Sequence, residues 1–205
     1  LVQLQVELAD GRMQTIVTDQ TWKYTLDGPI RYADILDGEM YDASREIPGW
    51  DTAAFHDAAW RPVDVLEKAK GKLVAQPNEP MRITKQVRPI SVNEVQPGVW
   101  VFDLGQNIAG FCNLYLQEPA ETIVRLRHAE MLNEDGTIYR TNLRMPSDGG
   151  PLGARQEDRY ICRGGGEMFQ PHFTYHGFQY VEVTGLTRKP SLDMLTGCAV
   201  HSAAP

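Results

Sequence analysis

A polar stretch in the second half of the chain, residues 125–144, carries the densest set of side chains that could bind a ligand. Its sequence, RLRHAEMLNEDGTIYRTNLR, holds one histidine, three acids, two asparagines and four arginines. The candidate binding residues in it are His128, Glu130, Asn142 and Arg144. The stretch begins with strand-like alternation, and Asp135-Gly136 predicts a turn. Such a surface could meet another domain, contact a sugar, or form internal hydrogen bonds alone.

Sugar binding needs an aromatic platform and planar polar groups that pair with hydroxyls, because unpaired buried polar groups are costly. The segment FTYHGFQY supplies Tyr175 and His176, and FDLGQNIAG supplies Asp103 and Asn107. In a strand, alternate aromatics more often face a core than a ligand. His176 and Gly177 interrupt the alternation as a β-bulge does, which makes this the more informative signal.

Hydrolysis of a glycosidic bond needs two carboxyl groups, roughly 5 Å apart for retention and roughly 6.5–9.5 Å apart for inversion. The chain is rich in acids, but no pattern in the sequence brings two of them together. It also has no GxSxG nucleophile motif. The sequence therefore predicts no catalytic residues.

Metal binding has weak support. His172 and His176 have helical ligand spacing, yet HFTYH reads as a strand, in which residues four apart lie about 13 Å from each other. The segment DILDGE, residues 34–39, gathers carboxylates on a turn, which suits calcium chemically but lacks the EF-hand spacing. We predict no metal site and no cofactor, with Asp37 and Asp42 as the weak calcium candidates.

Composition limits the function classes. The 205 residues contain 27 acidic and 20 basic side chains, a formal charge of −7, which disfavours nucleic acid as a partner. No run of 18 apolar residues suggests a membrane span. Three cysteines form neither a CxxC pair nor an even disulfide set, so we expect buried free thiols.

The hydrophobic pattern predicts an all-β chain. Residues 2–8 alternate, Asp10-Gly11 signals a hairpin, and residues 13–17 return as its second strand. Residues 66–80 change to charged, small and proline-punctuated sequence, which indicates a domain boundary. Short strands then recur at about 81–87, 98–103, 111–117, 121–128, 158–163, 171–175, 178–184 and 192–200. We predict two β-sandwich or jelly-roll-like modules, residues 1–72 and 73–205.

Several long motifs closely resemble the bacterial α-L-rhamnosidases of glycoside hydrolase family 78. They are FDLGQNIAG, LRHAEMLNEDGTIY, TNLR and FTYHGFQYVEVTG in the second module, with IVTDQTWKY, DGEMYDA, PGWD and WRPV in the first. The resemblance covers nearly the whole chain. It implies that residues 1–72 are the later part of the family's amino-terminal β-sandwich, an incomplete module, and that residues 73–205 are its concanavalin-like module.

The same resemblance implies what the chain does. In that family the catalytic acid and base lie on an (α/α)₆ barrel that follows these modules, and the reaction inverts the anomeric centre. We therefore expect an accessory region that supports the barrel of the same polypeptide, is inactive alone, and contacts rhamnose-containing glycosides at most. A related module is known as calcium-assisted and rhamnose-binding, which makes Asp37, Glu39, Tyr41 and Asp42 candidates for a residual sugar or metal site.

Two alternatives belong to other functional classes. The chain could be a free-standing lectin-like module, which requires a concave polar pocket with an aromatic wall. It could also be an interaction domain whose polar rim meets only protein. We favour docking for residues 125–144, which requires an exposed apolar patch beside residues 128–144. The sequence does not indicate a compartment.

Overall fold

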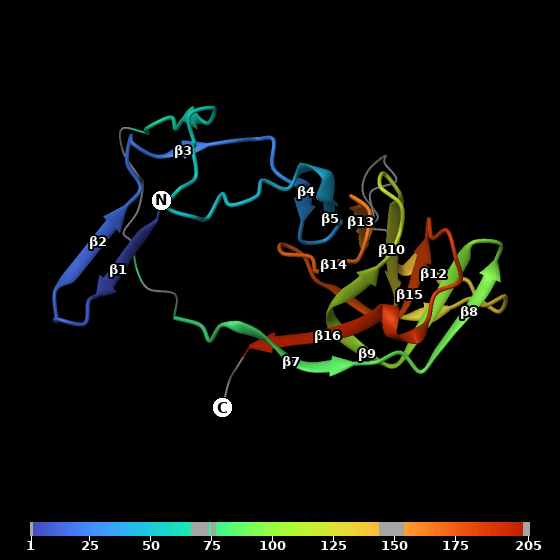
Figure 1. Cartoon of the computed structure of the whole chain (residues 1–205). Coiled ribbons are helices and arrows are strands. Elements are labelled where there is room, and N and C mark those ends of the chain that lie inside the picture. The colour runs from blue at the N-terminus through green and yellow to red at the C-terminus, as the bar shows by residue number, and fades with distance from the viewer. Residues whose placement is uncertain (1, 67–73, 75–76, 144–153, 203–205) are drawn as a thin grey trace. The chain divides into compact units, whose positions relative to one another are not determined.

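The structure, a computed structural model, describes residues 2–66, 74, 77–143 and 154–202. These residues form strands joined by turns and by three short 3₁₀ helices, so the all-β prediction is confirmed (Figure 1). Among them, no helix has the length and apolar character that crossing a membrane requires.

The chain divides into two compact units that do not follow chain order. The first contains Leu1–Gly28 and Ile47–Gln76, and the second contains Pro29–Glu46 and Pro77–Pro205. The division predicted at residues 72 and 73 remains a prediction. The structure adds a feature that the sequence did not reveal, since residues 29–46 join the second unit.

The described part of the first unit contains two small sheets. Strands β1 (Gln3–Glu7) and β2 (Met13–Val17) form the predicted hairpin, and β3 (Lys23–Tyr24) pairs with β6 (Arg61–Pro62). None of the described residues of this unit is fully buried. A sheet without a covered face gains little from the hydrophobic effect, so burial contributes little to the stability of this unit.

The second unit is built on one curled ten-stranded sheet. Its main path runs β4-β5-β13-β10-β15-β9-β16-β7, and β8 and β14 also pair with β9. The strands are β4 (Ile30–Asp34), β5 (Gly38–Asp42), β7 (Met81–Val87), β8 (Ser91–Gln96), β9 (Val99–Leu116), β10 (Ile123–Ala129), β13 (Glu157–Ile161), β14 (Glu167–Phe169), β15 (His176–Thr184) and β16 (Leu195–Ser202). Two short strands, β11 (Met131–Leu132) and β12 (Ile138–Tyr139), form a separate hairpin.

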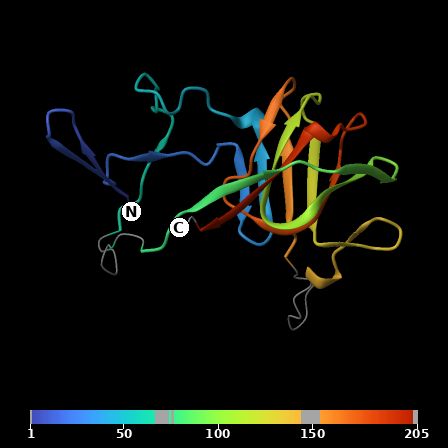
Figure 2. The same ribbon diagram turned by 90° about the horizontal axis from the view of Figure 1, so that it is seen from below.

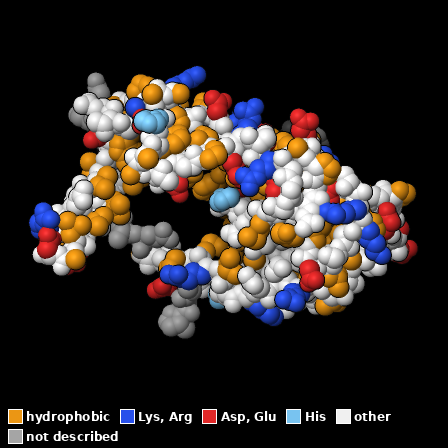
Figure 3. Space-filling model, in the orientation of Figure 1, with side chains coloured by type: hydrophobic (Ala, Val, Ile, Leu, Met, Phe, Trp, Pro, Cys, Tyr) orange, Lys and Arg blue, Asp and Glu red, His pale blue; other side chains and the backbone are white. Residues whose placement is uncertain are grey.

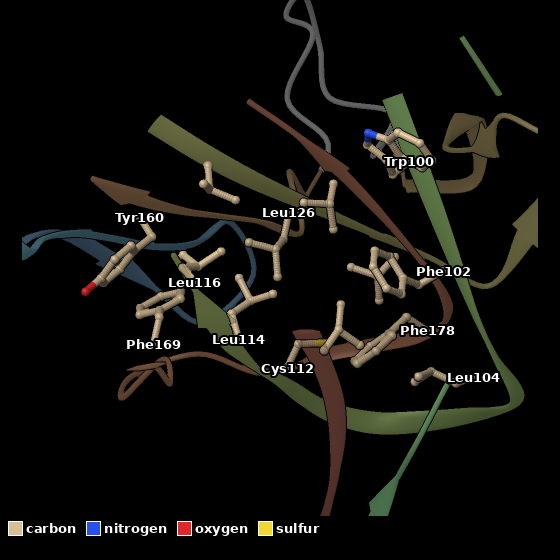
Figure 4. Close-up of a cluster of buried hydrophobic side chains, with 14 of the residues drawn as sticks. Trp100, Phe102, Leu104, Cys112, Leu114, Leu116, Leu126, Tyr160, Phe169 and Phe178 are labelled. Carbon is tan, nitrogen blue, oxygen red and sulfur yellow. The ribbon is translucent and has the colours of Figure 1, made fainter. Parts of the chain in front are cut away.

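The main hydrophobic core lies inside the curled sheet, and Val101, Ala129 and Ile138 form a second, smaller cluster. Along β10 and β13 buried residues alternate with less buried ones, as a half-buried strand requires. Phe102, Leu114 and Phe178 are fully buried and converge from β9 and β15 (Figure 4). The three cysteines, Cys112, Cys162 and Cys198, are buried and free, which confirms the expectation for them.

The β4–β5 hairpin extends this sheet at β13. Strand β5 pairs with β13 in parallel, with Tyr41 opposite Tyr160. Figure 2 shows the two blue strands beside the orange and yellow-green strands of the sheet. The helical connection that usually links parallel strands is not needed here, because β5 and β13 are far apart in sequence.

Three predicted strands differ from the observed ones. The predicted strands 98–103 and 111–117 are parts of one continuous strand, β9. Residues 171–175 are not a strand. Their backbone is held differently, because the amides of His172 and Phe173 donate to the Glu39 carboxylate at 2.9 and 3.0 Å instead of to a neighbouring strand.

Candidate functional site

An open pocket of about 240 Å³ lies where the β4–β5 hairpin meets β13. Tyr32, Asp37 and Arg155 are among its lining residues. The Tyr32 hydroxyl donates to Oδ2 of Asp37 at 3.1 Å, and the Arg155 amide donates to Oδ1 of Asp37 at 3.0 Å. The pocket therefore joins an aromatic ring, a carboxylate and a guanidinium, the groups that recognise hydroxyl-rich ligands.

Glu39 also borders this pocket, but its carboxylate serves the fold. The residue is 1% exposed, and its oxygens accept hydrogen bonds from the amides of His172 and Phe173 and contact Nδ1 of His172 at 3.2 Å. A buried carboxylate is tolerated only when it is paired in this way. The candidate Glu39 thus fixes the 172–175 loop against β5.

The candidates Tyr41 and Asp42 point elsewhere. The Tyr41 ring stacks on Tyr160 with centroids 5.7 Å apart, and its hydroxyl donates to Glu46 at 3.1 Å. Asp42 accepts from the Ser44 amide at 3.1 Å and caps a 3₁₀ helix, Ala43–Arg45. Asp37 directly precedes β5 and Asp42 is its last residue, so the length of the strand separates them and one calcium ion could bind only one of the two.

The second candidate cluster is buried. His128 on β10 and His176 on β15 stack with ring centroids 4.2 Å apart, and both face Asp158 on β13. Nε2 of His176 lies 3.2 Å from Oδ2 of Asp158, and Nε2 of His128 lies 3.9 Å from the same oxygen. All three side chains are wholly buried. We call this set the His–Asp–His cluster.

Burial controls protonation in the His–Asp–His cluster. Loss of solvent, with the neighbouring His176, lowers the pKa of His128 to about 3, so its ring is neutral. Burial alone would raise the pKa of Asp158, but its hydrogen bond to His176 and the nearby histidines lower it overall. The Glu39 amide adds a hydrogen bond to Oδ1 of Asp158 at 2.9 Å, so this carboxylate links the hairpin to the sheet.

The candidates of the FDLGQNIAG motif form a polar group on β9. Asp103 accepts from the Gly105 amide at 2.7 Å and from the Gln179 side chain at 3.0 Å. Asn107 donates to Glu130 at 2.8 Å, and both are exposed. Glu130 and Asn107 are therefore brought together, whereas Asp103 supports the bulge of β15 between Phe178 and Tyr180.

The remaining candidates lie at the surface or outside the described residues. Asn142 is exposed in a 3₁₀ helix, Thr141–Leu143, and Tyr175 is 41% exposed in the loop before β15. Arg144 lies outside the described residues. The predicted turn at Asp135-Gly136 is confirmed, because Gly136 has a φ of 81° and its amide donates to Asn133 at 3.0 Å.

Sequence reasoning missed Asp158, the centre of the His–Asp–His cluster. A signal was available in EDRYIC, where Asp158 shares its strand face with Tyr160 and Cys162. An acid at an inward position of an apolar strand face needs a buried partner. The identity of that partner is not visible in the sequence.

Comparison with known proteins gives matches along the whole chain. Residues 93–201 match the bacterial alpha-L-rhamnosidase concanavalin-like domain, and residues 1–85 match the alpha-L-rhamnosidase N-terminal domain. The chain is 46% identical to an alpha-L-rhamnosidase of Streptomyces avermitilis over 211 aligned residues, covering 100% of the chain and 19% of that relative.

Solved structures agree. The crystal structure of the Streptomyces avermitilis alpha-L-rhamnosidase complexed with L-rhamnose superposes with a TM-score of 0.90 at 45% identity, covering 99% of this chain and 19% of that one. The alpha-L-rhamnosidase from Dictyoglumus thermophilum gives a TM-score of 0.88 at 38% identity, covering 98% and 22%. The chain thus spans about one fifth of the length of the relatives it matches.

Proposed function

The chain belongs to the bacterial α-L-rhamnosidase family, and on that premise we propose that it is an accessory region that supports the catalytic barrel of a rhamnosidase-type glycoside hydrolase. The observation that carries the proposal is the extent of the matches, which cover this chain completely but only about one fifth of each relative. Other domains of the same polypeptide are implied. In this proposal the (α/α)₆ barrel removes terminal α-L-rhamnose, and this chain contributes no catalytic residue.

Two exposed apolar side chains support a docking role for the stretch from residue 128 to 144. Met131 is 50% exposed and Leu132 is 38% exposed, both on the β11–β12 hairpin. Scattered hydrophobic side chains are common on protein surfaces, as Figure 3 also shows for one face. Met131 and Leu132 follow each other in β11 and therefore point to opposite faces of the hairpin, so each face offers one exposed apolar side chain for a contact. The occupant proposed is the barrel of the same polypeptide.

A pair of variants in the full-length parent enzyme tests the docking role. We expect Met131→Ser with Leu132→Ser to lower the unfolding temperature of the full-length enzyme and leave that of the isolated chain nearly unchanged. Met168→Ser is the matched control, because Met168 is 74% exposed on β14, away from this hairpin in sequence. Equal effects on the isolated chain and the full-length enzyme would contradict docking.

The pocket at Tyr32, Asp37 and Arg155 supports a second candidate function, direct carbohydrate contact. It has the aromatic wall and the polar groups that a lectin-like module requires. An NMR titration of the chain with L-rhamnose, with D-mannose as control, tests it in calcium and then in chelator. Saturable shifts with rhamnose alone, lost in Asp37→Asn, support sugar binding. No shifts at tens of millimolar sugar would remove this candidate.

A further inference from the structure

Two buried ring nitrogens of the His–Asp–His cluster have no hydrogen-bond partner among the described residues. Nδ1 of His128 lies 3.0 Å from the carbonyl oxygen of Gln156, which can only accept, so Nδ1 carries the hydrogen. With the hydrogen on Nδ1, the nitrogen that can offer a lone pair to a ligand is Nε2. That nitrogen has no hydrogen-bond partner among the described residues. It faces Asp158, a carboxylate, at 3.9 Å.

The remaining groups do not supply the missing donor. Oδ1 of Asp158 accepts from the Glu39 amide, and Nε2 of His176 lies 3.2–3.3 Å from both carboxylate oxygens. Nε2 of His176 is the nitrogen that faces the carboxylate, and its Nδ1 has no partner among the described residues. Two imidazole nitrogens and a carboxylate thus converge in a dry interior, where unpaired acceptors are costly.

A cation bound beside the Asp158 carboxylate would give the unpartnered Nε2 of His128 a partner. We propose that His128, Asp158 and His176 bind one divalent transition-metal ion, of which Zn²⁺ is the representative. One ligand atom from each residue lies within 4.8 Å of the others, a spread that small side-chain rotations can close around an ion. Two imidazoles and a carboxylate suit Zn²⁺, whereas calcium prefers sites made of oxygen ligands alone.

The hydrogen bonds around the His–Asp–His cluster orient its side chains in the way that outer contacts orient metal ligands. The Gln156 carbonyl holds the tautomer of His128 that leaves Nε2 available, and the Glu39 amide orients Asp158. Such outer contacts orient metal ligands in proteins. His128 also packs edge-on against Phe178 with centroids 4.7 Å apart, a contact that helps to exclude solvent.

The role of this ion is structural. Complete burial of the three side chains prevents a substrate from reaching them. The ligands belong to β10, β13 and β15, and Asp158 also holds the hairpin through Glu39. An ion at this point would cross-link three strands and the β4–β5 hairpin, and would enter as the chain folds.

Refolding with defined metal tests the proposal. The chain is unfolded in chelator, refolded with Zn²⁺, with Co²⁺ or in chelator, and passed through gel filtration before elemental analysis. We expect about one Zn²⁺ per refolded chain and a higher unfolding temperature than in chelator. Co²⁺ would give visible absorption bands of a nitrogen- and oxygen-ligated site.

Variants assign the ligands. Asp158→Asn and His128→Gln are expected to reduce bound metal to below about 0.1 per chain. His201→Gln is the matched control, because His201 is exposed on β16, and it is expected to retain the metal. If the ligand variants fail to fold, X-ray absorption spectroscopy of the wild-type zinc form tests the assignment instead. We expect it to show two imidazole ligands on the zinc ion.

Three outcomes overturn the proposal. The first is a wild-type chain that refolds in Zn²⁺ with native near-ultraviolet circular dichroism but retains no metal. The second is metal that is retained equally in Asp158→Asn and His128→Gln. The third is an absorption spectrum without imidazole ligands, which would place the ion on surface acids.

Discussion

At the scale of single residues, Glu39 shows how a binding candidate can be a structural group. Both backbone amides donate to Oε2 of Glu39, and Oε1 faces Nδ1 of His172, so Glu39→Gln keeps the shape but removes the charge that these buried bonds share. Because hydrogen bonds to a charged group are stronger than those to a neutral one, we expect a loss of about 1–3 kcal/mol in unfolding free energy. Chemical denaturation measures it, and hydrogen exchange should rise at residues 172–175.

Glu46→Gln provides the comparison for that variant. Glu46 pairs with Arg163 at the surface, with its side chain 34% exposed, and exposed ion pairs contribute little. We expect Glu46→Gln to lower the unfolding free energy by much less than Glu39→Gln does. Equal losses would show that the Glu39 carboxylate is not a buried anchor.

The three thiols offer another test at this scale. Burial raises the pKa of Cys162 to about 12 and also raises the pKa values of Cys112 and Cys198. Thiolate, the reactive form, is therefore scarce near pH 8 in the folded chain. We expect a thiol reagent to label none of the three within minutes in the folded protein and all three in guanidinium, as mass spectrometry would show. Fast labelling of a folded thiol contradicts this burial.

At the scale of elements, the parallel pairing of β5 with β13 depends on Gly38. Its φ is 114°, and a Cβ there would lie 2.0 Å from the Glu157 carbonyl oxygen. We expect Gly38→Ala to destabilise the second unit by more than about 2 kcal/mol, because both the backbone conformation and the close strand approach are lost. Thermal and denaturant unfolding would measure the change.

Gly165→Ala separates the two causes. Gly165 also has a positive φ, 103°, but a Cβ there would meet nothing within 4 Å. We expect Gly165→Ala to lower the unfolding free energy only by the backbone strain, about 1–2 kcal/mol. If both variants lose the same stability, the close approach of β5 to β13 contributes nothing.

At the scale of the whole molecule, the two units differ in burial. The second contains the hydrophobic core, whereas no described residue of the first is fully buried. Local opening is easiest where few apolar groups are buried. We expect amide hydrogen exchange in β1 and β2 to be at least about tenfold faster than in β9, β10 and β15. Mass spectrometry of peptic fragments would show it, and equal protection would contradict it.

By itself, the sequence determined the all-β class, the β1–β2 hairpin, the strand at Met81–Val87 and the family resemblance of motifs such as FDLGQNIAG. These features depend on period-two alternation, turn residues and local motifs, which neighbouring residues encode. The sequence also indicated His128 and His176 as separate candidates, but it did not reveal Asp158, the residue that both of them face.

Only the tertiary structure decided which of these residues meet. It placed Asp158 between two histidines from other strands, moved residues 29–46 into the second unit, and showed that Glu39 holds a loop that the pattern predicted as a strand. The physical reason is that strand order and register depend on packing between distant segments. Alternation tells which side of a strand a residue faces, but not which strand lies beside it.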